Sequence, residues 1–90
     1  MPAAAPPPWR VNAYESGRCV AFQYSFGSLE NIRGNPNEVA FTSPCPYKTL
    51  VQCYSEPNGK GSVSSANFDA GSRIKFNVGA FKSWEVYARH

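Results

Sequence analysis

The chain has 90 residues, 42% of them hydrophobic, and a formal net charge of +3 at pH 7. This length indicates one domain, and the nine scattered lysines and arginines, no two of them adjacent, argue against the basic stripe of a nucleic-acid-binding surface. No apolar run approaches the roughly 18 residues that a transmembrane helix needs, and the prolines of residues 2–8 interrupt any signal-peptide core.

The chain opens with a tail of proline and alanine, residues 1–8, which offers nothing to pack and is expected to be disordered. From Trp9 onward, apolar residues recur at every second position, the period of a half-buried strand. Breakers at residues 34–36 predict a long loop over residues 27–37. The first half is expected to contain strands at Trp9–Tyr14 and Val20–Phe26, a turn at Glu15–Arg18, and a short strand or fold-over segment at Val39–Phe41.

The second half continues the pattern, with a strand at Thr49–Tyr54 and a turn in the Pro-Asn-Gly-Lys-Gly stretch at 57–61. Further strands are expected at Ser62–Ala66, Arg73–Phe76 and Trp84–Arg89. About eight short strands separated by frequent turns predict an all-β sandwich or barrel. The aromatic residues expected in its core are Phe22, Tyr24, Phe26, Phe41, Phe81 and Trp84.

A faint internal repeat of forty residues organises the chain. Residues 51–90 align on residues 11–50 with nine identities, and five of these form the pattern Asn-x-x-Ala-Phe-x-Ser with a tyrosine four residues later. Self-similarity at a fixed period is a signal about the whole fold. It predicts one pseudo-symmetric domain over residues 9–90, made of two four-strand units at about 9–48 and 49–90.

The repeat carries a spacing that resembles a known family. Tyr54 is followed after six residues by Gly61, and Ser83 lies 29 residues after Tyr54; Tyr14 and Ser43 have the same separation. This arrangement resembles the Greek-key motif of the βγ-crystallins. The resemblance implies a β-sandwich of about eight strands formed by two Greek-key motifs.

The resemblance also implies roles for the motif residues. Gly61 is expected to take a positive φ, which only glycine adopts without strain, and the Ser83 hydroxyl is expected to tie down the preceding hairpin. In the first copy the glycine position holds Ala21, a departure from the family pattern.

Within the superfamily, the chain looks most like the small secreted antimicrobial and killer-toxin-like members. The aromatic-x-x-Gly-x-Cys layout at Tyr14–Cys19 and the ending at Gly79–Ser83 carry this likeness. Those proteins have six cysteines, whereas this chain has three, and only Cys19 occupies a similar place.

Calcium is the one cofactor that the resemblance suggests, through the pattern (Asn/Asp)-(Asn/Asp)-x-x-(Ser/Thr)-Ser. The first copy retains Glu38, Thr42 and Ser43, whereas the second has lost its acidic residues and places Lys82 where a hydroxyl ligand belongs. Since calcium needs six to eight oxygen ligands, several of them anionic, we expect one impaired site or none.

The three cysteines, Cys19, Cys45 and Cys53, leave three possible pairings open. One disulfide and one free thiol are preferred over a zinc site, because no histidine or Cys-x-x-Cys spacing accompanies them, and over three reduced buried thiols. The only histidine is the terminal His90, and the only aspartate is Asp69. No catalytic set can be assembled from these, so a non-enzymatic protein is expected.

A surface of exposed aromatic and basic residues is a candidate for contact with sugars or a membrane interface. Its members are expected to be Trp9, Arg10, Tyr47, Lys48, Tyr87 and Arg89.

The leading functional prediction is a secreted defence or toxin protein, antimicrobial or directed at a host, that acts by binding. Its partner would be a cell-surface or cell-wall component or a host protein, and the protein is expected to be a monomer. One alternative is a structural or stress-related crystallin. Another is a small secreted proteinase inhibitor, for which the stiff segment Ser43-Pro44-Cys45-Pro46 would be the reactive loop.

Overall fold

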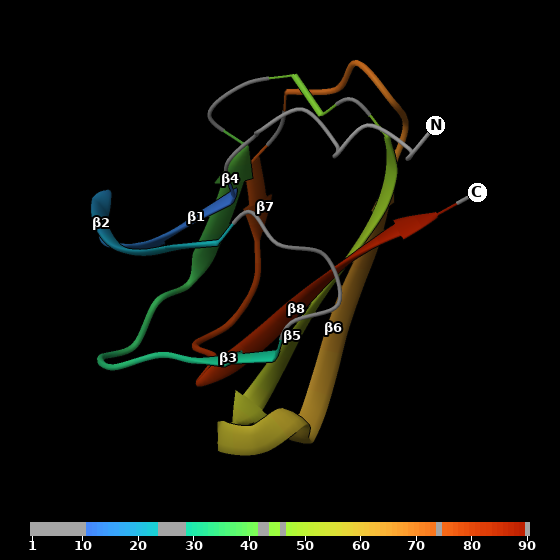
Figure 1. The fold of residues 1–90 in the computed structure, drawn as a ribbon. Helices are drawn as coiled ribbons and strands as arrows, with labels where there is room; N and C mark the ends of the chain where they lie inside the picture. Colours follow the sequence, from blue (N-terminus) through green and yellow to red (C-terminus); the bar gives the residue numbers. More distant parts are fainter. Residues whose placement is uncertain (1–10, 24–28, 42–43, 46, 74, 90) are drawn as a thin grey trace, which may run out of the picture.

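The computed structural model describes residues 11–23, 29–41, 44–45, 47–73 and 75–89, and these form two four-stranded antiparallel sheets (Figure 1). The prediction of an all-β domain is confirmed. Within the described ranges, no helix has the length and hydropathy that crossing a bilayer requires. The elements are β1 (Val11–Glu15), β2 (Arg18–Gln23), β3 (Leu29–Asn31), β4 (Glu38–Phe41), β5 (Lys48–Glu56), the 3-10 turn η1 (Pro57–Gly59), β6 (Lys60–Phe68), β7 (Lys75–Asn77) and β8 (Ser83–Arg89).

The two sheets have the same internal order. One runs β2-β1-β4-β7, and the other, taken from its far edge, runs β6-β5-β8-β3. Exchanging each strand for the one four places away in the chain, β7 for β3 included, converts one order into the other. Each sheet therefore takes three strands from one half of the chain and a three-residue strand, β7 or β3, from the other half.

Local turn chemistry explains the two hairpins. Ser16 and Gly17 have φ of 53° and 81°, and positive φ at both central positions is the signature of the two-residue type I′ turn that fits the strand twist. The second hairpin turns through η1, where Asn58 and Gly59 have φ of 63° and 70°. Both turns lie where the sequence predicts them.

Residues forty apart occupy equivalent positions in β1 and β5. In the strands that pair with β1 and β5, residues forty apart do not occupy equivalent positions. Val11 and Val51 are both fully buried. Val11 pairs with Phe41, whereas Val51 pairs with Val86, five residues beyond the position that the repeat indicates. Phe81, the repeat partner of Phe41, instead enters the core from the segment before β8.

The core lies between the sheets and is built from alternate positions of the strands. Its largest fully buried side chain is Trp84. The predicted strand at Thr49–Tyr54 lies within β5, where Thr49, Val51 and Cys53 face inward and alternate with half-buried neighbours. Phe41 and Phe81 are also buried, as predicted, whereas Tyr24 and Phe26 lie outside the described residues.

One predicted core residue, Phe22, is 57% exposed, so that prediction is wrong. Directly opposed residues of neighbouring strands share one face of a sheet. Ala21 pairs with the fully buried Ala13, whereas Phe22 pairs with Asn12 and therefore lies on the outer face of the edge strand β2.

Candidate functional site

The predicted aromatic and basic surface is described in part. Trp9 and Arg10 lie outside the described residues. Lys48 is exposed at the start of β5 and pairs with Arg89 at the end of β8, so these two basic positions are neighbours in the ladder. The described members of the set are the half-buried Tyr47, Lys48, the half-buried Tyr87 and the backbone of Arg89.

Tyr87 belongs to a polar cluster on the β3-β8-β5-β6 sheet that the sequence did not predict. The Tyr54 hydroxyl donates to Oε1 of Glu85, and the Tyr87 hydroxyl donates to Oε2 at 2.5 Å. The hydrogen bond to Glu85, followed by burial, raises the pKa of Tyr54 to about 12 and also raises the pKa of Tyr87. Both phenols therefore remain neutral at physiological pH, and both carboxylate oxygens are engaged.

A surface cleft lies beside the β1–β2 hairpin. It has a volume of about 410 Å³ and is lined by residues of the hairpin and of the segment that follows β3. The type I′ turn brings Glu15 at the end of β1 next to Arg18 at the start of β2. The lining residues are Glu15, Arg18, Cys19, Val20, Arg33 and Gly34.

The Glu15 carboxylate joins the two sides of the cleft. Its Oε2 accepts a hydrogen bond from the Asn35 backbone N–H at 2.7 Å, and its Oε1 lies 4.0 Å from an Arg18 guanidinium nitrogen. Gly34 permits this approach, because its φ is +81° and a Cβ there would lie 2.6 Å from Glu15 Oε2. The first half of the chain thus supplies both walls.

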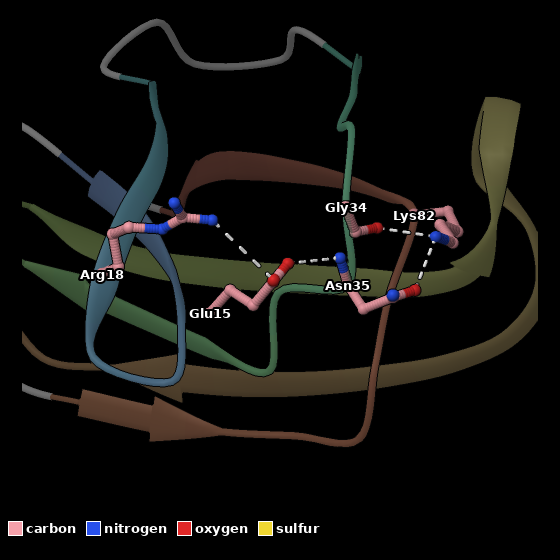
Figure 2. A network of polar contacts seen from close by, with 5 residues as sticks. All are labelled: Glu15, Arg18, Gly34, Asn35 and Lys82. Carbon is pink, nitrogen blue, oxygen red and sulfur yellow. Dashed lines mark hydrogen bonds and ion pairs between the residues drawn. The ribbon is translucent and has the colours of Figure 1, made fainter.

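The cleft is also connected to the second half of the chain. Figure 2 shows Lys82, just before β8, donating from Nζ to the Gly34 carbonyl at 2.6 Å and to Asn35 Oδ1 at 2.7 Å. Both acceptors are neutral, so the ammonium charge is not cancelled by its partners. The backbone contributes as well, since the N–H of Ile32 donates to the Lys82 carbonyl at 2.8 Å.

The cleft lining carries more positive than negative charge. Arg18 and Arg33 line it together with one carboxylate, that of Glu15, and the Lys82 ammonium contacts the Gly34–Asn35 segment that forms one wall. The Arg18 side chain is 78% exposed, so its guanidinium is available to a ligand. In the part of the chain that the structure describes, the only ion pair within 4.0 Å is the one between Glu15 and Arg18. The cleft can therefore attract an anionic group.

Of the expected calcium ligands, Thr42 and Ser43 lie outside the described residues, and Glu38 is half-buried at the start of β4. In the second copy of the calcium pattern, the Lys82 ammonium donates hydrogen bonds to the Gly34 carbonyl and to Asn35 Oδ1. A metal cation that approached these two oxygens would meet a like charge. Among the described residues, no three acidic, histidine or cysteine side chains are placed to share a metal.

The prediction of one disulfide is wrong, because all three cysteines are free thiols in separate surroundings. Cys19 is exposed in β2, whereas Cys45 and Cys53 are buried. The Cys45 Sγ lies 2.8 Å from Thr49 Oγ1 and donates to the Tyr47 carbonyl at 3.0 Å. Burial raises the pKa of Cys53 to about 12, which keeps this thiol protonated and unreactive.

Part of the predicted inhibitory segment, Ser43 and Pro46, lies outside the described residues. Its central residue, Cys45, is fully buried. The Cys45 N–H donates to the Ser72 carbonyl at 2.8 Å, and the Cys45 carbonyl accepts from the Gly71 N–H at 2.6 Å. An inhibitory loop presents its centre to the protease, whereas here the centre faces inward.

The motif residues of the second half meet at the β5–β6 hairpin. Gly61 has a φ of +82°, and a Cβ there would lie 2.2 Å from the Ser55 Oγ. Ser83 is fully buried at the start of β8, and its hydroxyl donates to the Glu56 carbonyl at 2.7 Å and accepts from the Gly59 N–H at 3.0 Å. One side chain from β8 thereby holds both arms of the turn.

The β1–β2 hairpin, which corresponds to the β5–β6 hairpin in the first half of the chain, is built differently. Its hairpin turns at Ser16–Gly17, and the positive φ falls at these two residues and not at Ala21. The Tyr14 hydroxyl accepts a hydrogen bond from Asn12 Nδ2 at 3.0 Å, while Ser43 lies outside the described residues.

Little in the sequence indicates the cleft, because its cationic residues are far apart along the chain. In the sequence, Arg33 matches Arg73 of the repeat, and Lys82 is a departure from the calcium pattern. The sequence marks Gly34 as a breaker, and the structure shows that its positive φ lets the two walls meet.

Comparisons with models of protein families, with curated proteins and with solved structures found no match to this chain. The strand order of the sheets and the charge of the cleft are therefore the observations that bear on its function.

Proposed function

We propose that this protein is a small secreted βγ-crystallin-like protein of two Greek-key motifs that acts without catalysis, by binding an anionic group on a cell surface or extracellular target. The exchange of β3 and β7 between the sheets supports the two-motif architecture. Each half places its first, second and fourth strands in one sheet and its third strand in the other. The conformation of Gly61 and the hydrogen bonds of Ser83 support it further, because they match the roles that the resemblance implies.

The observation that carries the binding function is the positive cleft. A guanidinium offers a planar pair of N–H donors that matches phosphate, sulfate or carboxylate oxygens, and such charge-assisted hydrogen bonds are among the stronger polar contacts. Arg18 and Arg33 line a cleft whose only carboxylate, Glu15, already accepts from the Asn35 N–H. Glu15 therefore orients the walls without neutralising the second arginine.

Other groups in the described residues favour binding over chemistry. The Cys53 thiol is buried and protonated, and the Glu85 carboxylate has a phenol on each oxygen. An activated nucleophile needs an adjacent base or a lowered pKa, and the shifts seen here run in the opposite direction. Recognition by charge and shape is the function that these residues support.

Co-sedimentation with lipid vesicles tests the site. Wild-type protein should bind phosphatidylcholine vesicles that contain phosphatidylglycerol, but not pure phosphatidylcholine vesicles, and binding should weaken as salt is added. The variant R18Q/R33Q should lose most of this binding. The matched control R73Q/K75Q removes the same charge from exposed positions near β7 and should retain it. Equal losses in the two variants would show that only net charge matters and would reject the cleft.

Growth inhibition tests the biological role. The purified protein is applied at low salt to a small panel of fungi and bacteria, with and without calcium. Dose-dependent inhibition that R18Q/R33Q lacks and R73Q/K75Q retains would support a toxin. Vesicle binding without inhibition would favour a host-directed protein, whereas neither binding nor inhibition would favour the structural crystallin.

A further inference from the structure

The four sheet edges of this molecule are not equally protected. The edges are β2 and β7 in one sheet and β3 and β6 in the other. β3 and β7 have only three residues each, and β2 has six, whereas β6 has nine. An edge strand presents unpaired backbone groups to any strand that approaches, and native proteins limit this by keeping edges short, charged or interrupted.

β6 has few of these protections. Its sequence is Lys-Gly-Ser-Val-Ser-Ser-Ala-Asn-Phe, with one charge, at Lys60, and no proline. Seven of its nine residues are exposed, and Val63 is 53% exposed. The register with β5 is regular from Val63 to Phe68, and its irregularity is confined to the end near the turn. The small side chains leave room for another strand to approach.

Two contacts show which backbone groups face away from β5. The Tyr54 carbonyl accepts from the Lys82 N–H, so it faces away from β6, and Tyr54 and its partner Val63 form a non-hydrogen-bonded pair. The Ser62 N–H points back toward β5, where it meets the Ser55 Oγ at 2.8 Å. Because the pattern alternates along an antiparallel ladder, the N–H and C=O groups of Val63 and Ser65 face outward.

We propose that β6 pairs antiparallel with β6 of a second copy of this chain, about a twofold axis through Ser64. This register places Val63 of one copy opposite Ser65 of the other, and each such pair exchanges two backbone hydrogen bonds. Lys60, the only charge in the strand, comes opposite Phe68 and one position from Asp69, which follows the strand in the other copy. The opposite charges attract at both ends of the pairing, whereas a parallel arrangement would align like charges.

The pairing joins two four-stranded sheets into one continuous sheet of eight. The same face of each sheet remains outward, since a twofold axis normal to the sheet preserves its faces. This dimer replaces the monomer expected from the sequence and goes beyond the binding function proposed above. It does not depend on that function, since β6 belongs to the sheet on the other side of the core from the β1–β2 hairpin that forms one wall of the cleft.

Sedimentation velocity on the full chain, from micromolar to millimolar concentration, tests the proposal. The mass should rise from that of one chain to twice that value as the concentration increases. Hydrogen exchange needs no variant: the amides of Val63 and Ser65 should be protected in the concentrated sample and exchange rapidly in the dilute one. A constant single-chain mass, or equally rapid exchange in both samples, would overturn the proposal.

A pair of charge variants tests the register. In V63K/S65K, lysines lie opposite one another at two places in the dimer, and dimerisation should weaken about tenfold. In V63K/S65E, each lysine lies opposite a glutamate, and dimerisation should be retained or strengthened. Equal dimerisation of the two variants would show that the copies meet elsewhere. Circular dichroism confirms that each variant is folded before its mass is interpreted.

Discussion

Replacing Ser83 with alanine removes a hydroxyl that makes two hydrogen bonds to the backbone of one turn. The hydroxyl donates to the Glu56 carbonyl at 2.7 Å and accepts from the Gly59 N–H at 3.0 Å. Ser83 is fully buried, so water cannot take the hydroxyl's place without local rearrangement. Glu56 is exposed and Gly59 half-buried, so their backbone groups can recover part of the loss by hydration.

The size of the effect follows from these two bonds. A typical intramolecular hydrogen bond contributes about 1 kcal/mol net, so Ser83→Ala should lower the free energy of unfolding by about 2 kcal/mol. For a domain of this length, each kcal/mol shifts the melting temperature by roughly 4–8 °C, so the midpoint should fall by about 10 °C. No cavity larger than one oxygen atom is created, so packing adds little.

Urea denaturation followed by far-UV circular dichroism, in dilute solution, measures this change. The matched control is Ser65→Ala, which removes the hydroxyl of an exposed serine in β6 and should stay within about 0.5 kcal/mol of wild type. The slope of the transition should be the same in all three proteins, because the fold is unchanged. If Ser83→Ala is as stable as Ser65→Ala, β8 does not hold the turn.

Three further predictions use other parts of the molecule. Cys19 should be the only thiol that reacts with Ellman's reagent in the folded protein, with all three reacting in denaturant; reaction of the folded Cys19→Ser variant would contradict this. Because folding raises the pKa of Tyr54 from 10.0 to about 12, its contribution to stability is complete below pH 10 and is lost as the pH rises toward 12. Urea melts across this range should show a smaller loss for Tyr54→Phe than for wild type. Gly61→Ala should destabilise the fold more than Gly71→Ala: both have positive φ, but only at Gly61 would the new Cβ meet a neighbouring side chain.

Features encoded by near neighbours could be predicted from the sequence. The strand β5 shows the alternation of Thr49, Val51 and Cys53 that indicates one buried face, and the structure buries these three residues. The turns at Ser16–Gly17 and Pro57–Gly59 fall where small and turn-forming residues interrupt the pattern. Such features depend on chemistry within a few residues, which a single sequence contains.

Features encoded by distant pairing could not be predicted. Leu29–Asn31 has a loop-like composition and becomes β3 only because β8, more than fifty residues later, supplies its ladder. The prediction that Phe22 is buried is wrong because alternation alone does not say which set of residues faces the core. Its pairing with Asn12 decides that question.

The cleft shows the same limit for function. Glu15, Asn35 and Lys82 are joined by hydrogen bonds in space, but nothing in the local sequence links them. The prediction of a disulfide is wrong for a similar reason, since the number of cysteines gives no information about the distances between them in the fold. The expected aromatic surface is only partly described, because Trp9 and Arg10 lie outside the described residues.

The exchange of β3 and β7 between the two sheets has a consequence for how the chain is made. Neither half contains a complete sheet, so a nascent chain that ends before β7 and β8 has no partner for β3, and only β5 and β6 of its second sheet are paired. Both sheets can therefore be completed only after β8 has been made, whereas the β1–β2 and β5–β6 hairpins pair strands that are adjacent in the chain.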